Sequence, residues 1–296
     1  MSEPTNATPL RIYTLLCNRD VDRALGCLSS LHSFCRDPFQ QTIIDDGSLM
    51  PRDIERLHEA IPALEILSRE EVEDQVGPKL QGKVNCQLYR KNHIFALKLI
   101  DSAMLSPGAF AQCDGDVLFL RPFQGFDRRP IGGEDVVFMK DSTTAYSISY
   151  LNRHFRHGRL RLPQFVNAGF MYADAGVFDL DFIEWFLGRE EFRRHAWVME
   201  QTAWAALGGR CRTHYFAPEQ VAFPRGNMYF RDDSVCLHFI SPLRHHLDDR
   251  EYTNELTRRS SAHYASLAML RTEPALYAGP LRDLSGRLYR RLRLRD

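Results

Sequence analysis

The chain has 296 residues, of which 44% are hydrophobic, and its 38 Lys and Arg residues balance 38 Asp and Glu residues. That apolar share is too high for a disordered chain, and the balanced charge disfavours general nucleic-acid binding, which normally needs a basic excess. At roughly 150 residues per domain, the length fits one large α/β domain or two small ones.

The first nine residues are mostly polar and lack the apolar core of a secretory signal, so we predict a disordered tail over 1–9. No run approaches the roughly 18 apolar residues that a transmembrane helix requires. The seven cysteines are scattered and form no Cys-x-x-Cys pair, which argues against a disulfide framework and a cysteine-type zinc site. We therefore expect a cytoplasmic protein.

Short apolar runs alternate in the next part of the chain with segments whose leucines recur at helical spacing. The apolar runs predict strands over residues 11–16, 41–44 and 64–67. Residues 18–22 supply capping side chains for a first helix, and Pro51 lies near the start of a second. Strands and helices in this alternation are typical of a parallel sheet with helices on its faces.

A third helix is predicted over residues 96–104, and Ser106-Pro107-Gly108 ends it. A strand over residues 109–113 then leads into Asp114-Gly115-Asp116 and a second apolar run. Apolar runs and helical spacing predict the later elements, namely strands over 136–139, 165–172 and 235–240, helices over 182–187 and 197–207, and further helix beyond about residue 250.

Two acidic clusters, Asp45-Asp46 and Asp114-Gly115-Asp116, come at the ends of predicted strands. In open α/β sheets, ligands bind at the carboxyl ends of strands. Aspartates in such places also cap helices and form turns, and this alternative stays open for Asp45 and Asp46. The carboxylates of Asp114 and Asp116 repel each other unless a cation neutralises them, so this pair indicates a divalent cation that holds a diphosphate.

The segment Ala111–Pro122, which reads AQCDGDVLFLRP, resembles the metal-binding motif of A-type-fold glycosyltransferases, enzymes that use nucleotide-sugar donors. Three further segments resemble those of family-8-like and glycogenin-like members, in the same order along the chain. They are the Asn-x-Gly strand at 165–171, the acidic-Gln pair Glu200-Gln201 and the late His-containing strand at 237–239. The resemblance implies one Rossmann-like α/β domain over 10–248, with a mixed, mainly parallel sheet and helices on both faces. A helical extension is expected over 249–296.

Matched one position at a time, the resemblance implies that Asp114, Asp116 and His238 bind the metal. This mixed oxygen and nitrogen ligand set suits Mn²⁺ better than Mg²⁺. Without the Asp-x-Asp segment, His238 would more simply be a core histidine, and Lys98 an exposed lysine. The implied donor-binding residues are Asp45 or Asp46 at the nucleobase, Asp114 at the metal or ribose, Lys98, and Arg244. The implied catalytic residues are Asn167 and Gln201, which would face the transferred sugar, and Glu200.

The implied reaction is metal-dependent transfer of a sugar from a nucleotide-diphosphate sugar, by default a UDP-sugar. The acceptor would be a hydroxyl group of a glycan, a lipid or a small molecule. The Asn-Ala-Gly and Glu-Gln segments resemble those of retaining relatives, which favours retention at the anomeric carbon. One departure is the run Ile240–His246, which replaces a Gly-x-x-Lys-Pro-Trp-like run, so Arg244 takes the lysine's place only by analogy.

Two alternatives stay open. A sugar nucleotidyltransferase would use similar chemistry, but such enzymes usually have a glycine-rich loop after the first strand, and residues 16–20 contain no glycine. The other alternative is an inactive member of the same fold, retained for glycan binding or as a scaffold. The intact Asp114, Asp116 and His238 argue against such decay.

Residues 281–296 combine a stripe of leucines with six arginines and two aspartates. A basic amphipathic helix can lie on an anionic membrane surface, so one interpretation is peripheral contact with the inner face of the membrane. The alternative, which we favour slightly, is a solvated or self-packing terminal helix.

Overall fold

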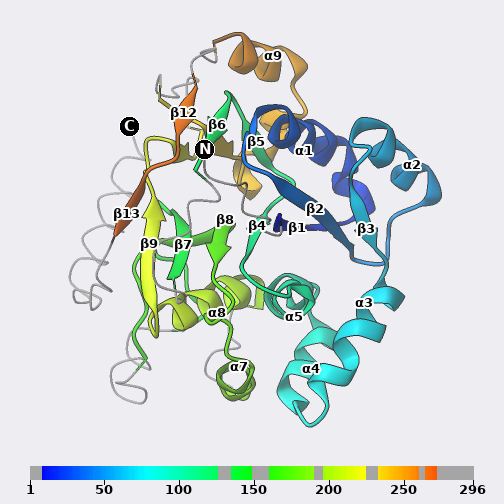
Figure 1. Cartoon of the computed structure of the whole chain (residues 1–296), viewed down its shortest axis with the longest axis vertical. Helices are drawn as coiled ribbons and strands as arrows, with labels where there is room; N and C mark the ends of the chain where they lie inside the picture. The colour runs from blue at the N-terminus through cyan, green and yellow to red at the C-terminus, as the bar shows by residue number, and fades with distance from the viewer. Residues whose placement is uncertain are drawn as a thin grey trace, which may run out of the picture.

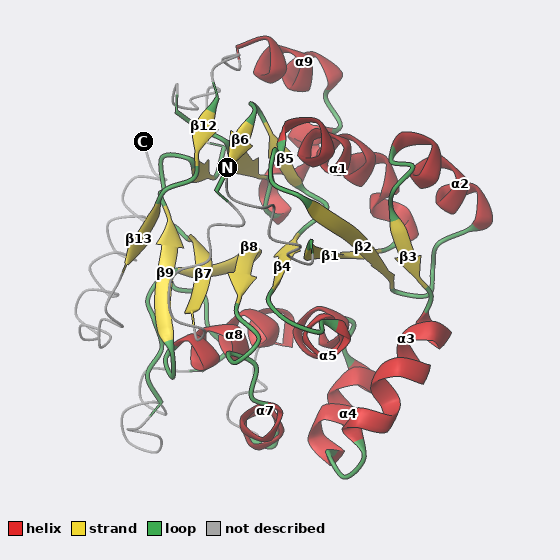
Figure 2. Cartoon of the chain, viewed as in Figure 1, coloured by secondary structure: helices red, strands yellow, loops and turns green. Residues whose placement is uncertain are grey.

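An eight-stranded sheet runs through the computed structural model (Figure 2), which describes residues 9–125, 135–148, 160–189, 196–224, 233–259 and 264–271. In spatial order its strands are β13 (Met269–Arg271), β9 (Arg212–Phe216), β7 (Asp135–Lys140), β8 (Val166–Ala173), β4 (Phe110–Cys113), β1 (Leu10–Leu16), β2 (Phe39–Asp45) and β3 (Glu65–Leu67). Strands β8 and β13 run antiparallel to their neighbours, and the other neighbouring pairs are parallel. The predicted mixed, mainly parallel sheet is confirmed.

Helices cover both faces of this sheet (Figure 1). On one face lie α1 (Val21–Phe34) and α2 (Pro51–Ala60). On the other face lie α3 (Arg69–Val76), α4 (Val84–Asn92), α5 (Ser102–Leu105), α7 (Leu180–Leu187) and α8 (Met199–Gly208). The predicted helices correspond to α1, α2, α5, α7 and α8, whereas α3 and α4 were not expected.

Strand β1 shows how the sheet separates two apolar cores. Because side chains alternate along a strand, Tyr13 and Leu15 face the core shared with α4, α5, α7 and α8. Leu16 lies on the opposite side, among the apolar residues of α1 and α2. The carboxyl end of β1 is therefore fixed from both faces, and it leads directly into the loop that precedes α1.

Two small sheets lie on the α1 side of the large one (Figure 2). One contains β5 (Val117–Phe119), β10 (Val221–Ala222) and β11 (Cys236–His238), and the other pairs β6 (Phe123–Gln124) with β12 (Ala265–Ser266). Strand β11 runs antiparallel to β5, and its register sets His238 opposite Val117. This pairing brings the late histidine next to the turn that carries the two aspartates.

The prediction for the start of α1 is wrong in one respect. Asp20 occupies the N-cap position but makes no capping hydrogen bond, because its carboxylate accepts hydrogen bonds from Cys17 and Arg23. A short 3₁₀ turn over Asn18–Asp20 leads into the helix instead.

Within the range 249–296, where a helical extension was expected, α9 (Arg250–Arg259) is a helix, but the expectation is wrong for β12 and β13, which are strands. The predicted basic helix at 281–296 and residues 1–8 of the predicted tail lie outside the described residues. Among the residues that are described, no helix is both long and apolar enough to cross a membrane.

Candidate metal and donor site

The two aspartates of the Asp-x-Asp segment meet the late histidine. Asp114 and Asp116 occupy the turn between β4 and β5, and the Nε2 atom of His238 lies 3.2 Å from Asp116 Oδ1 and 3.8 Å from Asp114 Oδ2. Ligand atoms of all three residues lie within 4.8 Å of one another. Two carboxylates and one imidazole at this spacing form a suitable set of ligands for a divalent cation.

Asp116 provides the test of whether a cation fits. Its Oδ1 atom is buried and accepts no hydrogen bond from the described residues, although His238 Nε2 lies 3.2 Å away. Its Oδ2 atom accepts a hydrogen bond of 2.6 Å from the Nε atom of Arg244. Burial raises the pKa of Asp116, but His238 and Arg244 outweigh it and hold that pKa below its usual value. The residue is thus an ionised carboxylate with one oxygen left for a metal.

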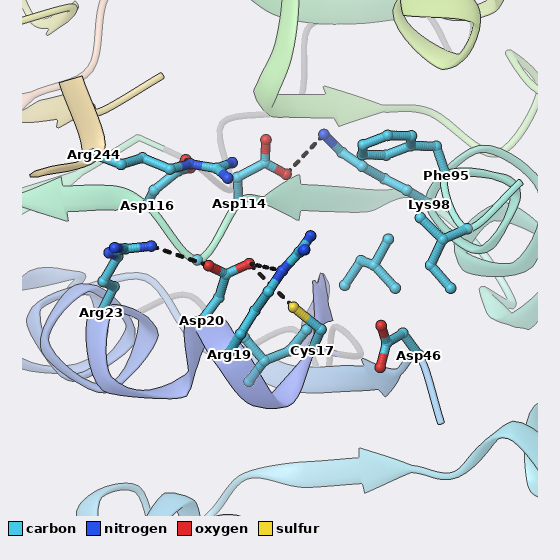
Figure 3. Close-up of a pocket in the computed structure, with 14 residues that line it drawn as sticks. Cys17, Arg19, Asp20, Arg23, Asp46, Phe95, Lys98, Asp114, Asp116 and Arg244 are labelled. Carbon is cyan, nitrogen blue, oxygen red and sulfur yellow. Dashed lines mark hydrogen bonds and ion pairs between the residues drawn. The ribbon is translucent and has the colours of Figure 1, made fainter. Parts of the chain in front are cut away.

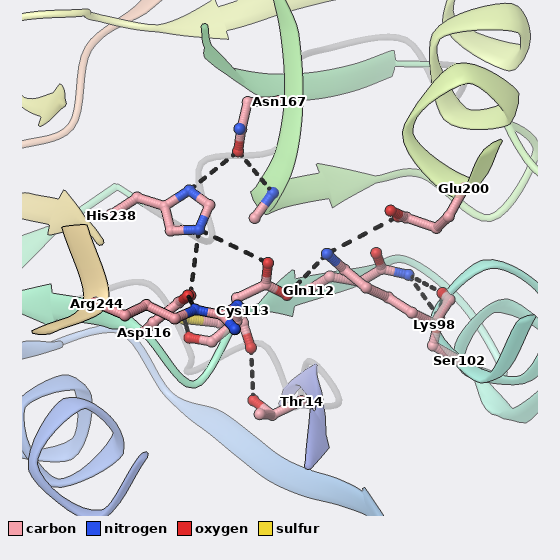
Figure 4. Close-up of polar contacts among 12 residues, drawn as sticks. Thr14, Lys98, Ser102, Gln112, Cys113, Asp116, Asn167, Glu200, His238 and Arg244 are labelled. Atoms are coloured by element: carbon pink, nitrogen blue, oxygen red, sulfur yellow. Dashed lines mark hydrogen bonds and ion pairs between the residues drawn. The ribbon is translucent and has the colours of Figure 1, made fainter. Parts of the chain in front are cut away.

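Lys98 is a buried cation of this site and not an exposed lysine. Its Nζ atom lies 2.7 Å from Asp114 Oδ1 and 3.9 Å from Glu200 Oε1 (Figure 4). Burial lowers the pKa of Lys98, but Asp114 and Glu200 outweigh it and raise that pKa above its usual value, so the ammonium stays charged.

The backbone around Lys98 is held in an unusual shape. Residues Leu97–Asp101 form a π-helical turn, a feature that is frequent at functional sites. The Lys98 carbonyl accepts hydrogen bonds from Ser102 Oγ at 2.6 Å and from Gln112 Nε2 at 2.5 Å. Gln112 belongs to β4, so the helix that carries the lysine is fixed directly to the strand that carries the aspartates.

Glu200, at the start of α8, lies on the other side of Lys98 from Asp114. Its Oε1 atom is buried and makes no hydrogen bond with the part of the chain that the structure describes, and Lys98 lies beside it as a cation. Burial raises the pKa of Glu200 to about 7, although Lys98 acts to lower it. Near neutral pH this carboxyl group can therefore take up or release a proton. Its neighbour Gln201 donates a hydrogen bond to the Ala145 carbonyl at 3.1 Å.

A cavity that is open to solvent lies beside the Asp-x-Asp turn, the carboxyl end of β1 and the start of α1 (Figure 3). Asp114 and Asp116 form one wall, and Asp46 lies across the cavity from them. Four cationic side chains also line it: Arg19, Arg23, Lys98 and Arg244. Four carboxylates in the same lining, those of Asp20, Asp46, Asp114 and Asp116, balance these cations. Guanidinium and ammonium groups bind phosphate oxygens strongly, so with a divalent cation on the two aspartates the cavity would suit an anionic ligand such as a diphosphate.

The structure separates the two adjacent acids of the first cluster. Asp46 lines the cavity, whereas Asp45 does not. Asp45 Oδ1 accepts hydrogen bonds from the backbone N–H groups of Gly47, Ser48 and Leu49. Asp45 therefore forms the turn after β2, and Asp46 is the acid that a donor nucleoside could reach.

Asn167 lies at the site, but its amide is engaged with protein groups. Its Oδ1 atom accepts hydrogen bonds from His238 Nδ1 at 3.1 Å and from the Gly169 N–H at 2.9 Å. Its Nδ2 atom donates to Asp141 Oδ2 at 3.2 Å. Asp141 was missed in the sequence, although it follows a predicted strand in the same way as the two acidic clusters do.

Comparison with solved structures identifies the fold. The match to mouse xyloside xylosyltransferase 1, in its apo form, has a TM-score of 0.53 at 11% identity and covers 92% of this chain and 100% of that one. The match to the apo bifunctional glycosyltransferase WbbM has a TM-score of 0.51 at 11% identity, and it covers 88% of this chain and 53% of that one, about half its length.

No family model and no curated protein matches the sequence. The architecture is nevertheless that of the A-type glycosyltransferases, as the resemblance implied. An identity of 11% supports the fold, and the activity must be argued from the site itself.

Proposed function

We propose that this protein is a metal-dependent glycosyltransferase that moves a sugar from a nucleotide-diphosphate sugar to a hydroxyl acceptor. The observation that carries the proposal is the meeting of His238 with Asp114 and Asp116, two acids that line a cavity, where the buried Asp116 Oδ1 atom accepts no hydrogen bond from the described residues. The cavity lies at the carboxyl ends of β1 and β4, where open α/β sheets bind ligands.

A bound divalent cation, Mn²⁺ or Mg²⁺, would offset the negative charge that develops on the leaving diphosphate. Asp114, Asp116 and His238 would hold it. Arg244 and Lys98 lie on the cavity wall beside the two aspartates, so their side chains would contact phosphate oxygens. Asp46, on the other side of the cavity, would contact the nucleoside.

The sugar side of the site is assigned to Glu200 and Gln201. The Lys98 ammonium lies between Asp114 and Glu200, so a sugar linked to the diphosphate would extend toward α8. We propose retention at the anomeric carbon, as the likeness to retaining relatives implies. We propose that the acceptor group is a hydroxyl, on a glycan, a lipid or a small molecule.

The first experiment is a thermal shift screen of UDP- and GDP-sugars with and without Mn²⁺. A donor present at roughly 100 times its Kd stabilises the folded protein by about 2.7 kcal/mol. We expect a UDP-sugar to stabilise the protein only when Mn²⁺ is present. If no nucleotide sugar shifts the melting temperature in the presence of Mn²⁺, the proposal is wrong.

The second experiment uses Asp116→Asn, which keeps the shape of the side chain and removes its charge. The variant should fold, as judged by its circular dichroism, and lose metal-stimulated hydrolysis of the nucleotide sugar. Unchanged hydrolysis would exclude Asp116 from the site. Formation of a nucleotide sugar from a nucleoside triphosphate and a sugar phosphate, with pyrophosphate release, would favour the nucleotidyltransferase alternative.

The contact with membranes stays a separate proposal. Binding to anionic vesicles should be lost when residues 281–296 are deleted, while turnover on a water-soluble acceptor is kept. Equal vesicle binding with and without these residues would contradict it.

A further inference from the structure

We infer that the segment Asn167-Ala168-Gly169 positions the metal ligands, and that Asn167 acts on His238 and not on the transferred sugar. This inference rests on the proposed metal site and assigns a role within it. It replaces the role that the resemblance implied for Asn167, and the contacts of three residues carry it.

The segment lies where β8 bulges away from β7. Phe138 pairs with Met171, but the next residue of β7, Met139, pairs with Asn167, so the register shifts at this point. A bulge of this kind redirects side chains and is frequent next to active sites. Here it brings Asn167 next to His238 and Gly169 next to Asp114.

The hydrogen bonds of Asn167 fix the orientation of its amide. The Gly169 N–H can only donate, so the atom that it contacts must be the amide oxygen. The Asp141 carboxylate accepts from the other end, which must be the amide nitrogen. Because Oδ1 is an acceptor, the Nδ1 atom of His238 must carry the hydrogen that joins them.

This hydrogen bond also determines which ring nitrogen of His238 faces the two aspartates. With Nδ1 donating to Asn167, the Nε2 atom is the one that faces Asp114 and Asp116. A metal-binding histidine usually donates its second ring N–H to a protein oxygen, which fixes its tautomer and orientation. Asn167 has this geometry, and its two amide ends are already engaged with His238, Gly169 and Asp141.

Gly169 contributes in two further ways. Its carbonyl accepts a hydrogen bond of 2.7 Å from the Asp114 N–H, so the segment also holds the Asp-x-Asp turn. A Cβ atom at this position would lie 2.5 Å from His238 Nδ1 and closer still to Cε1. The glycine is therefore needed for the imidazole to pack against the backbone, and the segment contacts two of the three proposed ligands.

The test measures Mn²⁺ affinity directly, by the electron paramagnetic resonance signal of free Mn²⁺, in the full chain without donor. Loss of an outer hydrogen-bond partner typically lowers metal affinity 10- to 100-fold, so Asn167→Ala should raise the Kd for Mn²⁺ by about tenfold or more. Asn85→Ala is the matched control, because Asn85 bonds Glu184 between α4 and α7 and should leave the Kd unchanged.

A double substitution distinguishes a positioning role of Asn167 from general damage to the fold. Asn167→Asp alone places two carboxylates next to each other and should also weaken Mn²⁺ binding. Combined with Asp141→Asn, it restores the same donors and acceptors in exchanged positions, so the double variant should recover the wild-type Kd within about threefold. Spin-echo detection of nitrogen coupled to Mn²⁺ should show the imidazole in the double variant and a weaker coupling in Asn167→Ala.

Two outcomes would overturn this inference without overturning the proposed metal site. If wild-type protein binds Mn²⁺ and Asn167→Ala binds it equally well, the positioning role is wrong and the proposed function stands. If Asn167→Ala weakens binding but the double variant does not recover it, the hydrogen-bond network is not the cause. Wild-type protein that binds no Mn²⁺ would overturn the proposed metal site and this inference together.

Discussion

Replacing Gly169 with alanine is the sharpest perturbation of the proposed metal site. The added Cβ atom would lie 2.5 Å from Nδ1 and 2.8 Å from Nε2 of His238, whereas ordinary contacts begin at 3.4 Å. Either the imidazole or β8 must therefore move by roughly 1 Å. Overpacking of this kind destabilises the folded state by about 1–3 kcal/mol.

The substitution is expected to weaken metal binding as well as folding. Metal–ligand distances tolerate changes of only about 0.2 Å, so a His238 ring displaced by roughly 1 Å would no longer lie within coordination distance of the metal. The same movement breaks the hydrogen bond from Nδ1 to Asn167. We expect Gly169→Ala to raise the Kd for Mn²⁺ at least about tenfold, the range found when supporting groups of a metal ligand are lost.

Gly208→Ala provides the control for packing damage alone. A Cβ atom on Gly208 would lie 2.9 Å from the Phe138 ring and 3.0 Å from Thr213 Oγ1, none of them among the proposed site residues. This variant should lose stability in urea titrations and keep the wild-type Mn²⁺ affinity. If Gly169→Ala also keeps that affinity, His238 is not held as we describe and the reasoning fails.

Three further predictions concern stability. Gly26→Ala lies inside α1, and apart from the helix's own backbone and the adjoining residues no described atom lies within 4 Å of the new Cβ, so the free energy of unfolding should rise by about 0.5–1 kcal/mol, and a decrease in urea titrations would contradict it. Arg90→Ala leaves the fully buried Asp101 without its ion-pair partner and should lower that free energy by about 3–5 kcal/mol; a loss under 1 kcal/mol would show that Asp101 is not ionised. Burial raises the pKa of Glu200 from 4.5 to about 7, so the folded state binds this proton more tightly than the unfolded state does. The stabilisation that proton binding to Glu200 gives the folded state is therefore fully present below pH 4.5 and is lost as the pH rises through about 7. Glu200→Gln should accordingly be more stable than wild type by up to about 3 kcal/mol at pH 8, but not at pH 4.5. An equal difference at the two pH values would refute the assignment.

Strands β1 to β4, β7 and β8 of the central sheet could be predicted because each contains a short apolar run. Strand β9 was missed because its sequence, RTHYF, is mostly polar, and β13 was wrongly expected to be helical. Helices α3 and α4 were missed because each buries few apolar side chains, Val72 and Val76 in α3 and Cys86 and Tyr89 in α4. One signal for α3 was present. Ser68 and Glu71 form a capping box, a pattern that marks the start of a helix.

The residues of the candidate site could be predicted from the sequence only in part. The local pattern identified Asp114 and Asp116, but their meeting with His238 depends on the pairing of β5 with β11, more than a hundred residues apart. No local pattern could distinguish Asp45 from Asp46, because the turn after β2 decides which acid faces the cavity. The role that we infer for Asn167 depends on a register shift between β7 and β8, and no local pattern in the sequence predicts that shift.

The position of β13 has a practical consequence for anyone who shortens this protein. The strand pairs with β9 at the margin of the large sheet, and the Ala217 N–H donates to the Ala268 carbonyl nearby. A truncation after α9 would remove this cover and leave the backbone groups of β9 open to other chains. Such a shortened protein should self-associate, so the C-terminal segment needs to be retained at least through Arg271 in any preparation meant for binding studies.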